Sequence, residues 1–160
     1  MHTINKFNVS HLWTVACQSS SIDYEKNTLS LFDTIDELNV TLGKETDLKK
    51  ALEEMKAKPA LIPVSCQLIS MWKKVDSKKE TAFTARITYQ DPQGFVLSTM
   101  DHEIRIPDGK MRTRYRINIP ALQANQEGEY RFAIEIIDPS KKSTVPVTEV
   151  PIDILISKEA

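Results

Sequence analysis

The stretch NQEGEYRFAIEI, residues 125–136, decides the fold class of this protein. A Gly-x-Tyr step, from Gly128 to Tyr130, leads directly into residues that alternate between apolar and charged. The apolar set is Tyr130, Phe132, Ile134 and Ile136, and the opposing charged set is Glu129, Arg131 and Glu135. Because side chains alternate between the two faces of a β-strand, this pattern predicts a strand with one buried and one solvated face.

Two further segments, 82–90 and 112–119, alternate in the same way. Weaker strand patterns cover 12–22, 29–42, 62–72, 95–106 and 145–156. Turn-forming residues separate these segments in YEKN (24–27), DPQG (91–94) and PDGK (107–110). Half-solvated strands in this rhythm are typical of antiparallel sheets, so we expect an all-β, antiparallel β-sandwich.

One segment, TDLKKALEEMKAKP at 46–59, departs from the strand pattern. Its apolar residues fall at helical spacing and form a narrow stripe: Leu48, Ala51, Leu52 and Met55. Thr46 is a suitable N-cap and Pro59 prevents continuation. We therefore predict one short α-helix, at about 46–57, inserted between the strands.

The composition favours one globular domain spanning residues 1–160. Of the 160 residues, 41% are hydrophobic and 27% are charged. The formal net charge is −1 and the pI is about 6.3. The chain as a whole therefore has no positive field that would recruit nucleic acid or an acidic membrane.

The cellular compartment is indicated by what the sequence lacks. No apolar run approaches the roughly 18 residues that a membrane span needs. The first thirteen residues, MHTINKFNVSHLW, contain neither the apolar core nor the small-residue cleavage site of a signal peptide. Two cysteines are too few for a disulfide framework. We expect a cytoplasmic protein that makes no membrane contact and keeps both thiols reduced.

The sequence shows no recognisable catalytic motif. His2, His11 and His102 are scattered, and none has a second ligand at metal-binding spacing. His102 is in register with Ile104, which indicates a partly buried strand histidine. No nucleophile elbow, phosphate-binding loop or dinucleotide glycine motif is present. We predict no catalytic residue, no metal and no cofactor, and interpret the protein as a non-enzyme.

Cysteines and loop acids are the remaining candidates for chemistry. Cys17 and Cys66 are interpreted as small buried hydrophobic residues, with a disulfide between the two sheets as the alternative. Four acids at loop positions raise the possibility of a calcium site at one end of the sandwich: Asp91, Asp101, Asp108 and Asp138. Turn chemistry already explains two of them, and no calcium-loop spacing is present.

The arginines are the best functional candidates. Four of the six lie between residues 105 and 116, and Arg112, Arg114 and Arg116 alternate on one face of a strand. One interpretation is a solvated face paired with acids of neighbouring strands, namely Glu103, Glu127, Glu129 or Glu135. The other is a partner-binding surface comprising Arg112, Arg114, Arg116, Arg105 and Trp13. Tryptophan is included because it is common among interface hot spots, although a core position is the alternative.

The segment GEYRFAIEI (128–136) resembles the tyrosine corner of immunoglobulin-like sandwiches. In those domains, the tyrosine hydroxyl bonds back to the chain a few residues upstream. Phe132 stands where antibody domains have a cysteine, and both cysteines of this chain precede Trp72. The resemblance implies an immunoglobulin-like β-sandwich that lacks the antibody-type disulfide.

A second resemblance covers about three-quarters of the chain. The segments TLSLFDTIDEL (28–38), DPQGFVL (91–97) and GEYRFAIEI…VPIDILI (128–156) occur in this order. In this respect the chain is similar to a family of small prokaryotic proteins described as a domain of unknown function. The resemblance implies a bacterial, archaeal or phage source and a sandwich fold, and it carries no catalytic residues over.

Together these observations lead to the hypothesis of a non-enzymatic protein-binding module. It would serve as an accessory or scaffold subunit of a larger prokaryotic or phage assembly, for example a defence or regulatory complex. We expect a protein partner, and an acidic one suits the arginine face. The alternatives are a small ligand-binding or hydrolytic domain with an unrecognised site, and a nucleic-acid-associated subunit that uses the arginine-lined strand.

Overall fold

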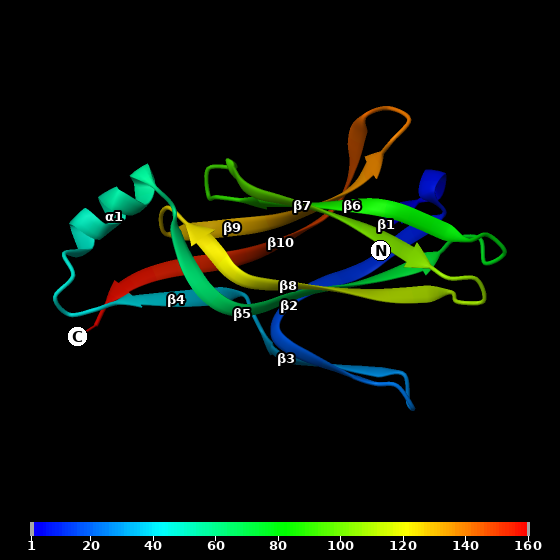
Figure 1. The fold of residues 1–160 in the computed structure, drawn as a ribbon, viewed down its shortest axis with the longest axis horizontal. Coiled ribbons are helices and arrows are strands. Elements are labelled where there is room, and N and C mark those ends of the chain that lie inside the picture. Colours follow the sequence, from blue (N-terminus) through cyan, green and yellow to red (C-terminus); the bar gives the residue numbers. More distant parts are fainter. Residues whose placement is uncertain (1, 160) are drawn as a thin grey trace.

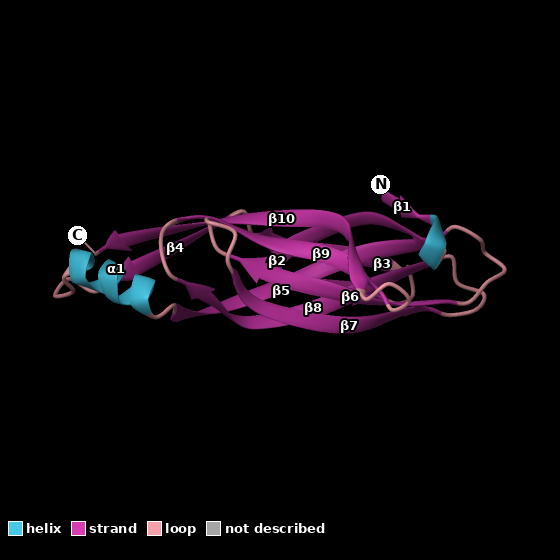
Figure 2. Ribbon diagram, turned by 90° about the horizontal axis from the view of Figure 1, so that it is seen from above, coloured by secondary structure: helices cyan, strands magenta, loops and turns pink. Residues whose placement is uncertain are grey.

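In a computed structural model, residues 2–159 form two β-sheets that pack face to face around one core (Figures 1 and 2). The first sheet has the order β1-β2-β5-β8, with β3 paired to β2: β1 His2–Ile4, β2 Val9–Asp23, β3 Thr28–Thr34, β5 Ala60–Lys74 and β8 Arg112–Ala124. The second has the order β4-β10-β9-β6-β7: β4 Glu37–Leu42, β6 Thr81–Gln90, β7 Val96–Ile106, β9 Gly128–Asp138 and β10 Ser143–Lys158. A 3-10 turn, η1 (Asn5–Phe7), and one helix, α1 (Leu48–Ala57), complete the described fold.

The all-β sandwich predicted from the alternating segments is confirmed. The strand that contains the opening stretch is β9, where Tyr130, Phe132 and Ile136 are buried while Glu129 and Arg131 are exposed. Trp72 of β5 also points inward, and its ring contacts the Phe83 ring at a centroid distance of 4.9 Å. The inner faces of both sheets therefore supply the core.

The sequence predicted one strand over residues 29–42. In the structure this segment forms two strands, which belong to different sheets. β3 ends at Thr34 in the first sheet and β4 begins at Glu37 in the second. Between them, Ile35 is buried and its N–H donates to the Ala16 carbonyl at 2.9 Å. The chain crosses from one sheet to the other here because Ile35 turns into the core.

One strand pair departs from the antiparallel arrangement that the sequence predicts. β4 runs parallel to β10, from Glu37 opposite Asp153 to Leu42 opposite Lys158. β4 enters the second sheet from the crossover at Ile35, so its direction is set by β3 rather than by a hairpin turn. The fold is thus a sandwich of antiparallel pairs with a single parallel pair among the described strands.

The predicted helix is present as α1, at the end of the sandwich nearest the C-terminus (Figure 1). Its N-cap is Asp47 instead of the expected Thr46, because the Asp47 side chain accepts the N–H of Lys50 at 3.2 Å. Its apolar stripe packs on the core through Leu48, Leu52 and Met55. The helix therefore covers one open end of the core.

The tyrosine corner is confirmed in atomic detail. Tyr130 is fully buried, and its hydroxyl accepts the N–H groups of Asn125 at 3.0 Å and Gln126 at 3.1 Å. The same hydroxyl donates to the Gln126 carbonyl at 2.7 Å. This one group therefore holds the loop between β8 and β9, where the chain passes from the first sheet to the second.

A second anchor ties the N-terminal turn to the loop between β9 and β10. Lys6 forms an ion pair with Asp138, which is 2% exposed. Ser140 donates to the same carboxylate from its backbone N–H at 3.1 Å and its hydroxyl at 2.7 Å. The bonds from Lys6 and then Ser140 lower the pKa of Asp138 to about 2, although partial burial opposes them.

This anchor predicts a specific pH dependence of stability. A carboxylate with a lowered folded-state pKa stabilises the fold above the unfolded pKa of about 3.9 and ceases to do so as the pH falls through about 2. We therefore expect Asp138→Asn to be less stable than the parent at pH 7. The difference should shrink between pH 4 and pH 2, roughly the interval between those two pKa values. Urea denaturation at pH 7, 4, 3 and 2 measures it, and a difference that stayed constant with pH would show that the charge of Asp138 has no role.

Candidate functional site

The three alternating arginines lie on the outer face of the first sheet. Arg112, Arg114 and Arg116 belong to β8, an edge strand whose ladder partner in the sheet is β5. Residues in the alternate phase face the core, where Tyr115 packs against the core cluster and Ile117 is buried. The predicted stripe is therefore a real row of side chains on one face.

The expected pairing of these arginines with acids on neighbouring strands is wrong. Glu103 and Glu129 belong to the second sheet and pair there with Arg105 and Arg131. Glu127 instead accepts the N–H of Ile156 at 2.8 Å. Glu135 also lies on the second sheet, in register with Arg86. Because β8 and β9 are consecutive in the chain but belong to different sheets, none of these acids is a lateral neighbour of the stripe.

Within residues 2–159, the stripe makes no ion pair. Arg114 donates to the Asn27 carbonyl at 2.8 Å and to its side-chain oxygen at 3.2 Å. Arg116 donates to the Ser20 hydroxyl at 3.3 Å. Arg112 is exposed and has neither a hydrogen bond nor an ion pair among the described residues. Positive charge on this face is consequently left without compensation.

Of the other two candidates, the structure places Trp13 with the stripe and Arg105 elsewhere. Trp13 pairs with Met71, and Met71 pairs with Arg114, so the three residues form one row across the outer face. Arg105 is an exposed residue of β7 in the second sheet. It cannot act together with Arg112 on one continuous face of the same sheet.

The β2–β3 hairpin folds back beside this outer face. Only the first half of β2 pairs with β5, up to Cys17, and the second half pairs with β3 and leaves the body of the sheet (Figure 1). The tip of the hairpin returns to β8, where Asn27 contacts Arg114. Ile69 is only 1% exposed although it lies on the outer face, between Val15 of β2 and Arg116 of β8.

Between the hairpin and β8 lies a groove of about 560 Å³. Its residues come from the hairpin, β5, the β7–β8 turn and β8: Ile22, Tyr24, Asn27, Met71, Pro107, Lys110, Arg112, Thr113 and Arg114. Three of them are cationic, and Ile22 and Met71 are half-buried apolar residues. Tyr24 is 88% exposed and stands at the rim. We call this feature the basic groove.

Sequence reasoning did not find the hairpin wall of the basic groove. The turn at 24–27 was predicted, but its return to β8 depends on a contact between residues 87 positions apart. One signal was present in β5. Ile69 and Met71 are out of phase with the core-facing Trp72, and apolar residues on a supposedly wet face indicate a covering element or a binding surface.

His11 and His102 belong to strands of different sheets, β2 and β7. His11 is buried against the Trp72 ring, and its Nε2 lies 2.7 Å from the Thr14 hydroxyl. His102 is partly buried, as expected, and its Nδ1 lies 3.2 Å from the Tyr115 hydroxyl. The side chain of His2 lies outside the described part of the protein.

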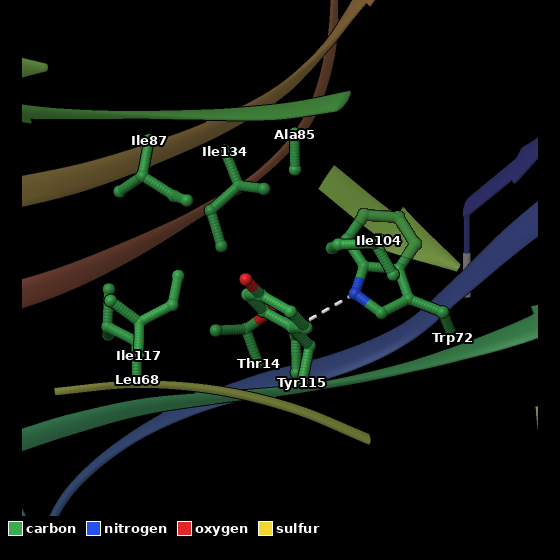
Figure 3. A pocket seen from close by; sticks show the side chains of 10 residues that line it. Thr14, Leu68, Trp72, Ala85, Ile87, Ile104, Tyr115, Ile117 and Ile134 are labelled. Atoms are coloured by element: carbon green, nitrogen blue, oxygen red, sulfur yellow. Dashed lines mark hydrogen bonds between the residues drawn. The ribbon is translucent and has the colours of Figure 1, made fainter. Parts of the chain in front are cut away.

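The cavity beside Trp72 is too small for a substrate. A cavity of about 10 Å³ lies beside Trp72, and its walls come from both sheets (Figure 3). The Trp72 ring N–H donates to the Ser70 hydroxyl at 2.8 Å, so its polar atom is satisfied within the wall. Space of this size holds one water molecule at most.

Both cysteines are free and buried, as the hydrophobic interpretation requires. Cys17 pairs with Gln67, so Cys66 points to the opposite face of the sheet, and the two side chains are not oriented for a disulfide. Burial, and next the neighbouring Cys17, raises the pKa of the Cys66 thiol to about 11. Burial also raises the pKa of Cys17. Protonated thiols are poor nucleophiles at neutral pH.

The four acids were expected at loop positions, but Asp101 lies within β7 and Asp138 is the last residue of β9. Asp101 pairs with Arg86 at 2.8 Å, and Asp138 pairs with Lys6. Asp91 accepts the N–H groups of Gln93 and Phe95 within its own turn. Over residues 2–159, no three His, Cys, Asp or Glu side chains gather as a metal site would require.

The fold and the groove define a class of protein, an all-β sandwich with a basic groove on the outer face of one sheet. No protein-family model matches the chain, and no curated protein matches it. Among solved structures, it is similar to the crystal structure of the C-terminal domain of Wzt, with 10% sequence identity and a TM-score of 0.45. That match covers 96% of this chain and 75% of the other. No functional argument follows from similarity at this level.

Neither α1 nor any other helix within residues 2–159 has the length and apolar character needed to cross a membrane.

Proposed function

We propose that this protein is a non-enzymatic binding module that captures a protein partner through the basic groove. The observation that carries the proposal is the uncompensated charge of Arg112 and Lys110 beside half-buried apolar side chains. Positive side chains at an interface steer and orient a partner of opposite sign. Ile22 and Met71 add apolar area that a partner would bury.

A protein partner suits the groove better than nucleic acid does. The net charge of −1 gives no overall attraction to a polyanion. Tyr24 is the one aromatic residue in the described groove lining, whereas single-strand binding uses several stacking platforms. The scaffold or accessory role in a cytoplasmic prokaryotic or phage assembly belongs to the same proposal, and two free thiols support the reducing compartment.

The test is a charge reversal of the groove, Lys110→Glu with Arg112→Glu. Neither side chain makes a hydrogen bond or ion pair in the described part of the protein, so the fold should be unaffected. In affinity capture from an extract of the native host, we expect a partner that the parent retains and the variant loses by at least about tenfold, because each cation contacting a carboxylate contributes a charge-assisted bond.

A matched control separates the groove from overall charge. Lys44→Glu with Lys49→Glu makes the same change in net charge at the other end of the molecule, near α1 (Figure 1). This control should retain the partner. Equal capture by all three proteins, or no partner above background, would rule out the groove as the binding site.

A further inference from the structure

We infer that the basic groove, if it binds protein as proposed above, takes an extended segment with the pattern acidic–apolar–acidic. The inference deepens the proposed function by naming the chemistry of the partner. It rests on three observations: the two-residue spacing of the arginines in β8, the contrast between the cationic β8 wall and the apolar hairpin wall, and the absence of a described ion pair at either arginine.

The spacing of the arginines matches an extended peptide. Arg112 and Arg114 are two residues apart on one strand face, so their attachment points lie about 7 Å apart. An extended peptide has the same two-residue repeat. Its side chains i and i+2 can therefore face both arginines at once, whereas neighbouring side chains i and i+1 point in opposite directions.

The hairpin wall of the groove explains why the middle residue of the bound segment, at position i+1, would be apolar. When side chains i and i+2 face β8, the residue between them points toward the hairpin. The hairpin contributes Ile22 and Tyr24 to the lining. An apolar middle residue would bury surface against these side chains, so the two walls select for different properties at alternate positions.

Arg112 and Arg114 can each bind a carboxylate of a partner without first breaking an ion pair. Arg112 has no described partner, and Arg114 donates only to neutral oxygens of Asn27. Arginine binds carboxylate in a bidentate, charge-assisted geometry that is stronger than its bonds to neutral acceptors.

The test uses synthetic peptides of one composition and two orders. The alternating peptide is Ser-Gly-Glu-Leu-Glu-Gly-Ser, the scrambled peptide is Ser-Gly-Glu-Glu-Leu-Gly-Ser, and a neutral peptide carries Gln in place of Glu. Binding to the full chain is measured by fluorescence anisotropy at low and moderate salt. We expect the alternating peptide to bind on the order of tenfold more tightly than the scrambled one, because only it engages both arginines.

Arg112→Glu is the informative variant. The Arg112 side chain makes no hydrogen bond or ion pair among the described residues, so its reversal should leave the Arg114–Asn27 contact of the hairpin in place. It should remove most of the preference for the alternating peptide, whereas Lys49→Glu should leave the preference unchanged. Circular dichroism and thermal unfolding of each variant separate lost binding from lost fold.

The outcomes distinguish this inference from the proposed function. Equal binding of the alternating and scrambled peptides would overturn the spacing inference while leaving a groove-dependent protein partner standing. If neither acidic peptide bound but host capture still depended on the groove, the spacing inference would be overturned and the proposed protein partner would be retained. A single-stranded oligonucleotide that bound more tightly than every peptide, with affinity falling steeply as salt rises, would overturn both proposals in favour of nucleic acid.

Discussion

Replacing Tyr130 with phenylalanine is expected to lower the free energy of unfolding by about 2 kcal/mol. The hydroxyl accepts two backbone N–H groups, from Asn125 and Gln126, and donates to the Gln126 carbonyl. Phenylalanine would fill the same space and leave these backbone groups unsatisfied in a partly buried loop. The cost therefore exceeds that of a single hydrogen bond, because unmet backbone groups lose their interaction with both water and protein.

Chemical denaturation of the parent and Tyr130→Phe measures this effect. The midpoint should fall while the slope of the transition stays constant, since both proteins expose the same surface on unfolding. Peptide and partner binding at the basic groove should remain intact, because the corner belongs to the β8–β9 connection and contributes nothing to the groove lining. A variant that was as stable as the parent but had lost its partner would show that Tyr130 belongs to a binding site.

Replacing Gly128 with alanine is expected to cost still more, about 3 kcal/mol. Gly128 has φ of +135°, a conformation that other residues rarely adopt and that costs on the order of 1–3 kcal/mol. A Cβ atom added here would lie 2.9 Å from Pro92 Cγ and 3.1 Å from its Cβ. The proline ring is rigid, so the contact can be relieved only if the β6–β7 turn moves.

Two further variants separate the cost of backbone strain at Gly128 from the cost of the contact with Pro92. Gly94→Ala also places alanine at a positive φ, +87°, but its Cβ would meet nothing within 4 Å, so it should show the backbone strain alone. Adding Pro92→Ala to Gly128→Ala should recover part of the loss, as a double-mutant cycle would quantify. If Gly94→Ala and Gly128→Ala were equally destabilising, the contact with Pro92 would contribute nothing.

The strands were the most predictable part of the structure. In β9, the alternation from Tyr130 to Ile136 identified both the strand and its buried face, because a period of two is a local property of the chain. The corner was predictable for a similar reason, since the Tyr130 hydroxyl reaches only four or five residues upstream. The helix cap differed by one residue, from Thr46 to Asp47, because both side chains can accept an N–H and only backbone geometry selects between them.

The candidate site was predictable only in part. The alternation of Arg112, Arg114 and Arg116 placed them correctly on one face. Their neighbours could not be predicted, since sequence order suggested acids of adjacent segments such as Glu129, which the structure assigns to the other sheet. Trp13 joins the stripe through Met71, a relation that depends on the order of β2, β5 and β8 within the sheet.

Local patterns in the sequence predict the elements of this protein: strands from alternation, turns from Gly, Pro and Asn, and the corner from the Gly-x-Tyr step. The tertiary structure alone decided which faces meet. It separated β3 from β4 and made one strand pair parallel. By returning the β2–β3 hairpin to β8, it also converted a solvated arginine face into one wall of a groove. The physical reason is that strand patterns arise from neighbouring residues, whereas sheet order and the groove depend on contacts between residues far apart in the chain.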